Sequence, residues 1–189
     1  MRDGGVVNRH LARRAVLSAI TLGVAARSAA AEEARDRRQA EALKSSAFQD
    51  AAGVTRRLRD LTRPLLMINL WAYWCSGCLT EIPSMLGMAR AIGAENIEVV
   101  LLSHAMNWTG DVRYARTAGF PFPLWRLVPL TPDSTIADTF RMQDNRFGLP
   151  QTLVFAGSGL RLVHASEGAE DWSSAARISR ARAWLAGAA

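Results

Sequence analysis

Residues 69–83 carry the sequence NLWAYWCSGCLTEIP, which contains both cysteines of this 189-residue chain, Cys75 and Cys78. The apolar run Leu65–Leu70 overlaps its start and is typical of a buried strand. The spacing of apolar residues over Cys75–Ile92 predicts a helix. Both thiols are therefore expected in the first turn of a helix that follows a buried strand. The positive end of the helix dipole favours a thiolate there, so we expect a lowered pKa for Cys75.

Two cysteines separated by two residues at this position are typical of a reversible redox disulfide. We predict that Cys75 attacks a substrate disulfide and that Cys78 resolves the mixed disulfide. A zinc site is the weaker interpretation, because beyond residue 31 the chain offers only His104 and His164 as histidine ligands, without finger-like spacing. Two inert cysteines, or a structural disulfide closing so small a loop, also remain possible. We predict no metal and no cofactor.

The segments on either side of this motif alternate between strands and helices. Apolar runs, turn residues and helical spacing predict the following elements: a hairpin within Phe48–Leu61, strands at Ile97–Leu102 and Leu124–Leu127, helices at Asp111–Ala118, Asp133–Phe140 and Ala175–Leu185, and a hairpin of Thr152–Ala156 and Leu160–His164. This order predicts an α/β domain with a mixed central sheet flanked by helices.

The charge is unevenly distributed along the chain. The formal net charge is +6, and the first 31 residues hold +4 of it, in five arginines and one aspartate. The remaining residues carry only +2, so the basic pI does not indicate nucleic-acid binding. We predict no nucleic-acid partner, and we expect a monomer.

The first 31 residues have the order of an export signal. A basic segment over Met1–Arg14 precedes the mildly apolar Ala15–Ala26, and Ala29–Ala31 fit a small-residue cleavage site. The paired Arg13-Arg14 resembles a twin-arginine signal, and the apolar part is too short to span a bilayer. We predict cleavage near Ala31 and a periplasmic mature protein. The alternative is a cytosolic amphipathic N-terminal helix.

The stretch at 69–83 resembles the active-site segment of the bacterial periplasmic TlpA/ResA group of thiol-disulfide oxidoreductases. That group shares the pattern N-x-W-A-x-W-C-x-x-C-x-x-E-x-P, and Gly148–Thr152 resembles its G-x-P-x-T loop. The resemblance extends over about Phe48–Leu185. It implies a thioredoxin-like domain at 48–189, preceded by an arm or helix at 32–47.

The same resemblance implies an activity and partners. It implies a protein-disulfide oxidoreductase that acts on protein thiols and disulfides, as a reductant fed by a membrane electron donor of the thiol-disulfide type. Apocytochromes in cytochrome c maturation and copper-site proteins are the substrates that the group suggests. Gly77 stands where the group commonly has proline, and Asn69 replaces the buried acid of ordinary thioredoxins.

Four further residues are candidates for the site. The resemblance implies that Pro150 follows a cis peptide bond facing the cysteines, so that the backbone of Leu149 pairs with an extended substrate. Trp74 abuts Cys75 and is a candidate contact surface, with simple packing as the alternative. Glu81 lies one helical turn beyond Cys78 and is a candidate for exchanging a proton with that thiol; otherwise it is a solvated helix residue.

Two other functions compete with this one. A copper-binding or copper-site-maturation chaperone of thioredoxin fold would use soft thiolates, but such proteins resemble a C-x-x-x-C pattern with a late histidine. Here the spacing is C-x-x-C, and His164 falls inside a predicted strand. A peroxidase of the peroxiredoxin type is the third hypothesis, and the absence of its threonine-x-x-cysteine segment argues against it. His104 ends a predicted strand and is expected in a loop or near the dithiol.

Overall fold

The computed structural model describes residues 30–31, 33–34, 36–38, 40–104, 107–128 and 148–188. The chain divides into two compact units, residues 1–38 and 39–189. In the first unit, the described residues from 30 to 38 are helical. The predicted helix over Asp133–Phe140 and all but the last two residues of the predicted export signal lie outside the described residues. The rest of this subsection concerns the second unit.

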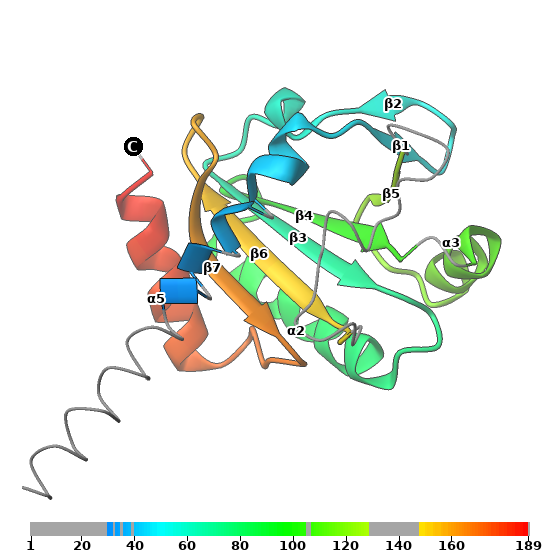
Figure 1. The fold of residues 1–189 in the computed structure, drawn as a ribbon. Helices are drawn as coiled ribbons and strands as arrows, with labels where there is room; N and C mark the ends of the chain where they lie inside the picture. The colour runs from blue at the N-terminus through cyan, green and yellow to red at the C-terminus, as the bar shows by residue number, and fades with distance from the viewer. Residues whose placement is uncertain are drawn as a thin grey trace, which may run out of the picture. The chain divides into compact units, whose positions relative to one another are not determined.

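The described residues form a seven-stranded mixed sheet with the order β2-β1-β5-β4-β3-β6-β7 (Figure 1). Its strands are β1 (Phe48–Asp50), β2 (Thr55–Arg56), β3 (Leu65–Trp71), β4 (Ile97–Ser103), β5 (Leu124–Leu127), β6 (Gln151–Ala156) and β7 (Arg161–Glu167). The central strands β3, β4 and β5 are parallel to one another. The pairs β1–β2, β1–β5, β3–β6 and β6–β7 are antiparallel.

The central strand β3 is buried on both faces, which explains its continuous apolar run. Its side chains alternate between two core clusters. Leu66, Ile68 and Leu70 belong to one cluster, which also takes in Ala40 and Leu43 from the helical residues before β1. The intervening side chains lie on the opposite face, against the helices that follow β3 and β7.

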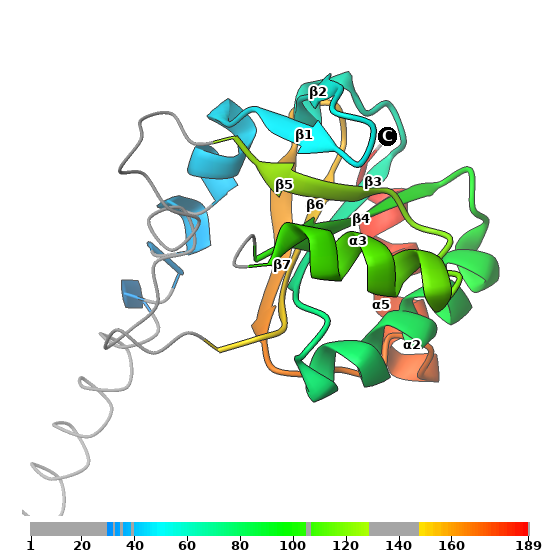
Figure 2. The same cartoon turned by 90° about the vertical axis from the view of Figure 1, so that its right-hand side faces the viewer.

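The helices with defined bounds are α2 (Ser76–Ile92), α3 (Trp108–Thr117), α5 (Ala175–Ala186) and a single 3-10 turn η1 (Leu58–Asp60). Figure 2 shows α2, α3 and α5 on the same side of the sheet. The short segment between β3 and α2 therefore lies at the end of the parallel strands, where α/β proteins place their sites. None of the helices in the described part of the chain is long and apolar enough to cross a membrane.

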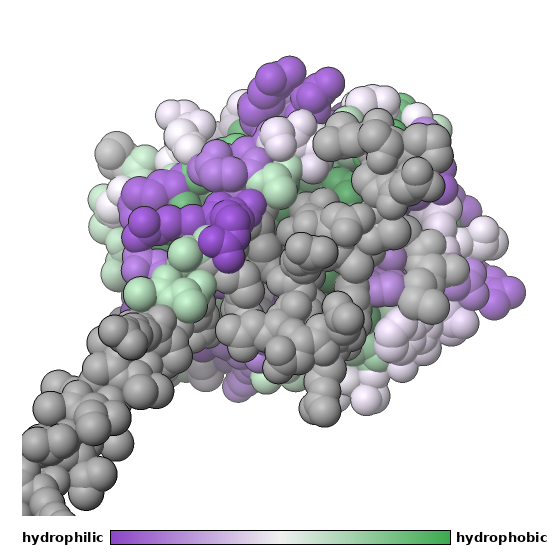
Figure 3. Space-filling view, in the orientation of Figure 1, coloured by the Kyte–Doolittle hydropathy of each residue, from purple (hydrophilic) through white to green (hydrophobic). Residues whose placement is uncertain are grey.

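Most sequence-predicted elements are confirmed within a residue or two. Helix α3 is the exception, since it begins at Trp108 instead of Asp111 because the side chain of Asn107 caps it by accepting from the amide of Gly110. Helix α2 continues through Pro83 to Ile92 and does not end early. On the face drawn in Figure 3, hydrophilic residues cover much of the described surface, with smaller apolar areas between them.

Candidate active site

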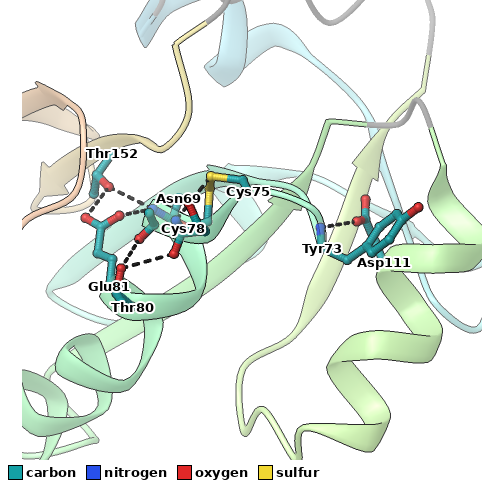
Figure 4. The surroundings of a disulfide bond; sticks show 10 residues. Asn69, Tyr73, Cys75, Cys78, Thr80, Glu81, Asp111 and Thr152 are labelled. Carbon is teal, nitrogen blue, oxygen red and sulfur yellow. Dashed lines mark hydrogen bonds between the residues drawn. A yellow bond between two sulfur atoms is a disulfide. The ribbon is translucent and has the colours of Figure 1, made fainter.

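The site is built around a disulfide between Cys75 and Cys78 at the start of α2 (Figure 4). Cys75 is the N-cap residue, and its sulfur accepts a hydrogen bond from the amide of Cys78 at 3.1 Å. Cys75 retains 7 % of its surface exposed, whereas Cys78 retains none. An incoming thiol therefore meets the sulfur of Cys75 first. In the reduced protein, the same amide and the helix dipole would favour a thiolate at that position.

The loop that carries Cys75 is fixed from the side of α3. The amide of Tyr73 donates to the Asp111 carboxylate at 2.8 Å, and the Ser103 hydroxyl donates to its other oxygen at 2.5 Å. Asp111 is 1 % exposed, and its burial raises the pKa of the carboxyl group. This residue ties the end of β4 and the active-site loop to the first turn of α3.

A second carboxyl group, that of Glu81, lies buried on the opposite side of the disulfide (Figure 4). The indole of Trp172 donates to its Oε1 at 2.5 Å. Asn69 donates to its Oε2 at 3.3 Å, and the Thr152 hydroxyl donates to Oε1 at 3.4 Å. Burial raises the pKa of Glu81 from 4.5 to about 7, and the hydrogen bonds from Trp172 and Asn69 act in the opposite direction. At 1 % exposure, Glu81 is not a solvated helix residue.

Asn69 links β3 to this carboxyl group. Its Nδ2 also donates to Thr152 Oγ1 at 2.9 Å, so one amide joins residues from β6 and α2. Its Oδ1 is buried and accepts no hydrogen bond from the described residues. A protonated Glu81 would be a donor, and an amide turned by 180° would offer it this oxygen.

The structure brings the remaining predicted residues to the same end of the sheet. The Leu149–Pro150 peptide bond is cis. A Cβ atom at Gly77 would lie 3.5 Å from Pro150 Cδ, so the proline ring contacts the turn between the two cysteines. Leu149 packs against the apolar cluster that contains both cysteines.

Trp74 is the exposed member of the site, with 53 % of its surface accessible. Its ring meets the ring of His104 edge to face at 6.1 Å. The amide of His104 donates to the carbonyl of Trp71 at 2.9 Å, and burial lowers the pKa of the imidazole. His104 therefore lies beside the residue that precedes Cys75.

The described residues do not support a metal site. They bring together no group of three or more His, Cys, Asp and Glu side chains that could hold a metal ion. His164 lies inside β7, as expected, where it contacts Trp172, Trp184 and Glu170. The copper hypothesis therefore gains no support from this part of the chain.

Two residues of the site, Asp111 and Trp172, were missed by the sequence analysis. Asp111 stands in the first turn of a helix, where an acid is common, so its position carries no distinctive signal. Trp172 is 91 residues from Glu81 along the chain. Nothing in the local pattern around either residue indicates that the two meet.

Comparison with known proteins identifies the family. The model of the AhpC/TSA family matches residues 38–160, which include both cysteines and the cis-proline loop. The chain belongs to the AhpC/TSA family. The match begins at the start of the second compact unit, so the helical residues before β1 are part of the AhpC/TSA region.

Solved structures similar to this AhpC/TSA protein confirm the thioredoxin-like fold. The thioredoxin domain of a thiol-disulfide oxidoreductase from Bacteroides vulgatus has a TM-score of 0.58 and 13% identity, covering 76% of this chain and 97% of its own. A thioredoxin-related protein from Neisseria meningitidis serogroup B has a TM-score of 0.55 and 19% identity, with coverages of 72% and 98%. StoA from Bacillus subtilis has a TM-score of 0.51 and 11% identity, with coverages of 73% and 93%.

Proposed function

We propose that this AhpC/TSA protein is an exported thiol-disulfide oxidoreductase that exchanges electrons with protein substrates through Cys75 and Cys78. One observation carries the proposal: the disulfide caps a helix N-terminus with Cys75 accessible and Cys78 fully buried. A structural disulfide spanning so short a loop would add little stability, so the placement favours chemistry. The resemblance to the TlpA/ResA group and the thioredoxin-like fold agree with this role.

The reaction consists of two thiol-disulfide exchanges. The thiolate of Cys75 attacks a substrate disulfide, forming a mixed disulfide and releasing one substrate sulfur as a thiolate. Cys78 loses its proton and attacks the sulfur of Cys75, which releases the second substrate sulfur. The substrate gains two electrons and the protein ends as the Cys75–Cys78 disulfide. A membrane donor of the thiol-disulfide type then supplies two electrons to reduce it again.

Glu81 takes the proton from Cys78 during the resolving attack and returns it when the disulfide is reduced. Cys78 is inaccessible to water, so a buried base one helical turn away is a suitable acceptor. A pKa of about 7 allows the carboxyl group both to accept and to donate a proton near neutral pH.

Trp74, Leu149 and Pro150 form the substrate-binding surface. Trp74 offers an exposed ring beside Cys75, and Pro150 contacts the turn between the cysteines. The backbone of Leu149 is the edge on which an extended substrate segment would pair.

Trapping with cysteine variants tests the proposal. Cys78→Ser should accumulate mixed disulfides with substrate proteins, because Cys75 attacks and nothing resolves the product. Cys75→Ser is the matched control and should trap none. Equal trapping by both variants would contradict the assigned roles, and trapping by neither would contradict the oxidoreductase itself.

The direction of electron flow requires a second measurement. Equilibration of the Cys75–Cys78 couple in a glutathione buffer gives its reduction potential. A value near that of thioredoxin, about −270 mV, is expected for a reductant, and one near −120 mV would identify an oxidant instead.

Export is tested at the N-terminus of the protein. In a host with twin-arginine export, protein from the periplasmic fraction should begin within a residue or two of Glu32. Replacing Arg13 and Arg14 with lysine should retain the uncleaved protein in the cytoplasm. Soluble cytosolic protein that starts at Met1 in the unmodified chain would refute the export signal.

A further inference from the structure

Trp172 precedes α5 and is held against α2 at two points. Its side chain is fully buried, and the indole N–H donates to Glu81 Oε1 at 2.5 Å. Its backbone amide donates to the hydroxyl of Ser84, three residues beyond Glu81 on the same helix, at 3.0 Å. The indole therefore meets the carboxyl group from a backbone that α2 itself anchors.

The other neighbours of the indole restrict it further. The guanidinium of Arg177 lies over the ring, 5.3 Å from its centroid, and the ring of His164 meets it edge to face at 5.5 Å. Glu170 joins these two groups, at 2.6 Å from Arg177 and 3.6 Å from His164. A cation over the face of an indole draws on the electron density of the ring, which makes the N–H a better donor.

The groups around Glu81 differ from those around the outer side of Trp172. Asn69 of β3, Thr152 of β6, the backbone of Glu170 and the indole contact the carboxyl group, and Cys78 lies one turn before it on α2. None of these contacts is a charged side chain. The charged side chains of Glu170, Arg177 and His164 pack on the indole or on one another instead.

We propose that Trp172 is a positioning residue for Glu81, whose indole N–H holds the carboxyl group in place and favours its ionised form. The inference rests on the proposed role of Glu81 as the proton partner of Cys78. A hydrogen bond from a neutral donor to a carboxylate is stronger than one to the carboxylic acid, so its loss raises the pKa of the acid. Trp172 thus sets the pH at which Glu81 changes from proton donor to proton acceptor.

A titration of the oxidised protein by NMR tests the contact without any thiol chemistry. The side-chain carboxyl carbon of Glu81, assigned by its loss in Glu81→Gln, should titrate near pH 7. In Trp172→Phe the midpoint should rise by about one pH unit, the effect of one lost hydrogen bond to a charged group. Trp184→Phe is the matched control, because Trp184 also stacks on His164 but donates no hydrogen bond to Glu81, and it should leave the midpoint unchanged. An unchanged midpoint in folded Trp172→Phe would overturn the inference.

A measurement on the unmodified side chain covers the case in which Trp172→Phe does not fold. The indole N–H signal of Trp172 should shift with the same midpoint as Glu81 and lose that shift in Glu81→Gln. The indole signal of Trp184 is the internal control. A Trp172 signal that does not follow the ionisation of Glu81 would overturn the inference.

Kinetics then connect the contact to the chemistry. The rate of disulfide reduction by dithiothreitol, divided by the thiolate concentration, should fall as Glu81 ionises. Its inflection should move upward by about one pH unit in Trp172→Phe, and Glu81→Gln should abolish the inflection in both backgrounds. A shift that persists in the Glu81→Gln background would mean that Trp172 acts only through general packing. Failure of the proposed function is read separately, from the absence of trapped mixed disulfides.

Discussion

Replacement of Glu81 by glutamine is expected to remove a pH dependence from the folding stability. The pKa of Glu81 is about 7 in the folded protein and 4.5 as its ordinary value, a difference of about 2.5 units. Each unit corresponds to about 1.36 kcal/mol, so the proton contributes about 3 kcal/mol to the free energy of unfolding. Because the folded state holds this proton more tightly than the unfolded state, the contribution is complete below pH 4.5. It is lost as the pH rises to about 7.

The assay is urea denaturation of the oxidised protein between pH 4.5 and pH 8. The quantity of interest is the free energy of unfolding of the unmodified protein minus that of Glu81→Gln, which should fall by about 3 kcal/mol over this range. Shifted groups such as Asp111 and His164 are present in both proteins, so their contributions cancel in the difference. Replacement of the exposed Glu95 by glutamine is the matched control and should follow the unmodified protein. A difference that stays flat with pH would refute the argument that burial raises the pKa of Glu81.

Three further substitutions test the packing around the site. Gly77→Ala adds a Cβ at an ordinary contact distance of 3.5 Å, so the better helix propensity of alanine should raise the free energy of unfolding by about 0.5–1 kcal/mol. Gly87→Ala on the same helix places a Cβ 2.9 Å from that of Ser173, so it should destabilise the protein by about 1–3 kcal/mol in the same urea assay; stabilisation by both would contradict the observed packing. Asp111→Asn loses one of its two accepted hydrogen bonds and should cost about 1–3 kcal/mol, with faster hydrogen exchange at the Tyr73 amide; unchanged exchange there would show that the loop does not depend on this carboxylate.

The parts of the fold that could be predicted from sequence are those with a local cause. The uninterrupted apolar residues of β3 and β4 indicate strands buried on both faces. The Gly157–Gly159 turn predicts the hairpin of β6 and β7, which the structure confirms. The two cysteines announce the site because their spacing in a first helical turn is rare without a chemical reason.

The polar contacts of the site could not be predicted in the same way. Glu81 meets Trp172 only because α2 and the start of α5 pack on the same face of the sheet. Sequence spacing placed Glu81 near Cys78 but could not distinguish a buried carboxyl group from a solvated one. Likewise, Asp111 reaches Tyr73 across 38 residues, through the position of α3 beside the end of β4.

The wide sequence separation of the groups around Glu81 has a consequence for folding. Its donors come from β3, β6 and the loop before α5, so the complete set spans residues 69 to 172. A chain that has folded only as far as β4 would have Glu81 and Asn69 but neither Thr152 nor Trp172. The carboxyl group would then be more open to water and would titrate nearer to its ordinary value of 4.5. The titration midpoint of this one glutamate is thus a reporter of whether the C-terminal half has docked, and it distinguishes a fully folded protein from a partly folded one.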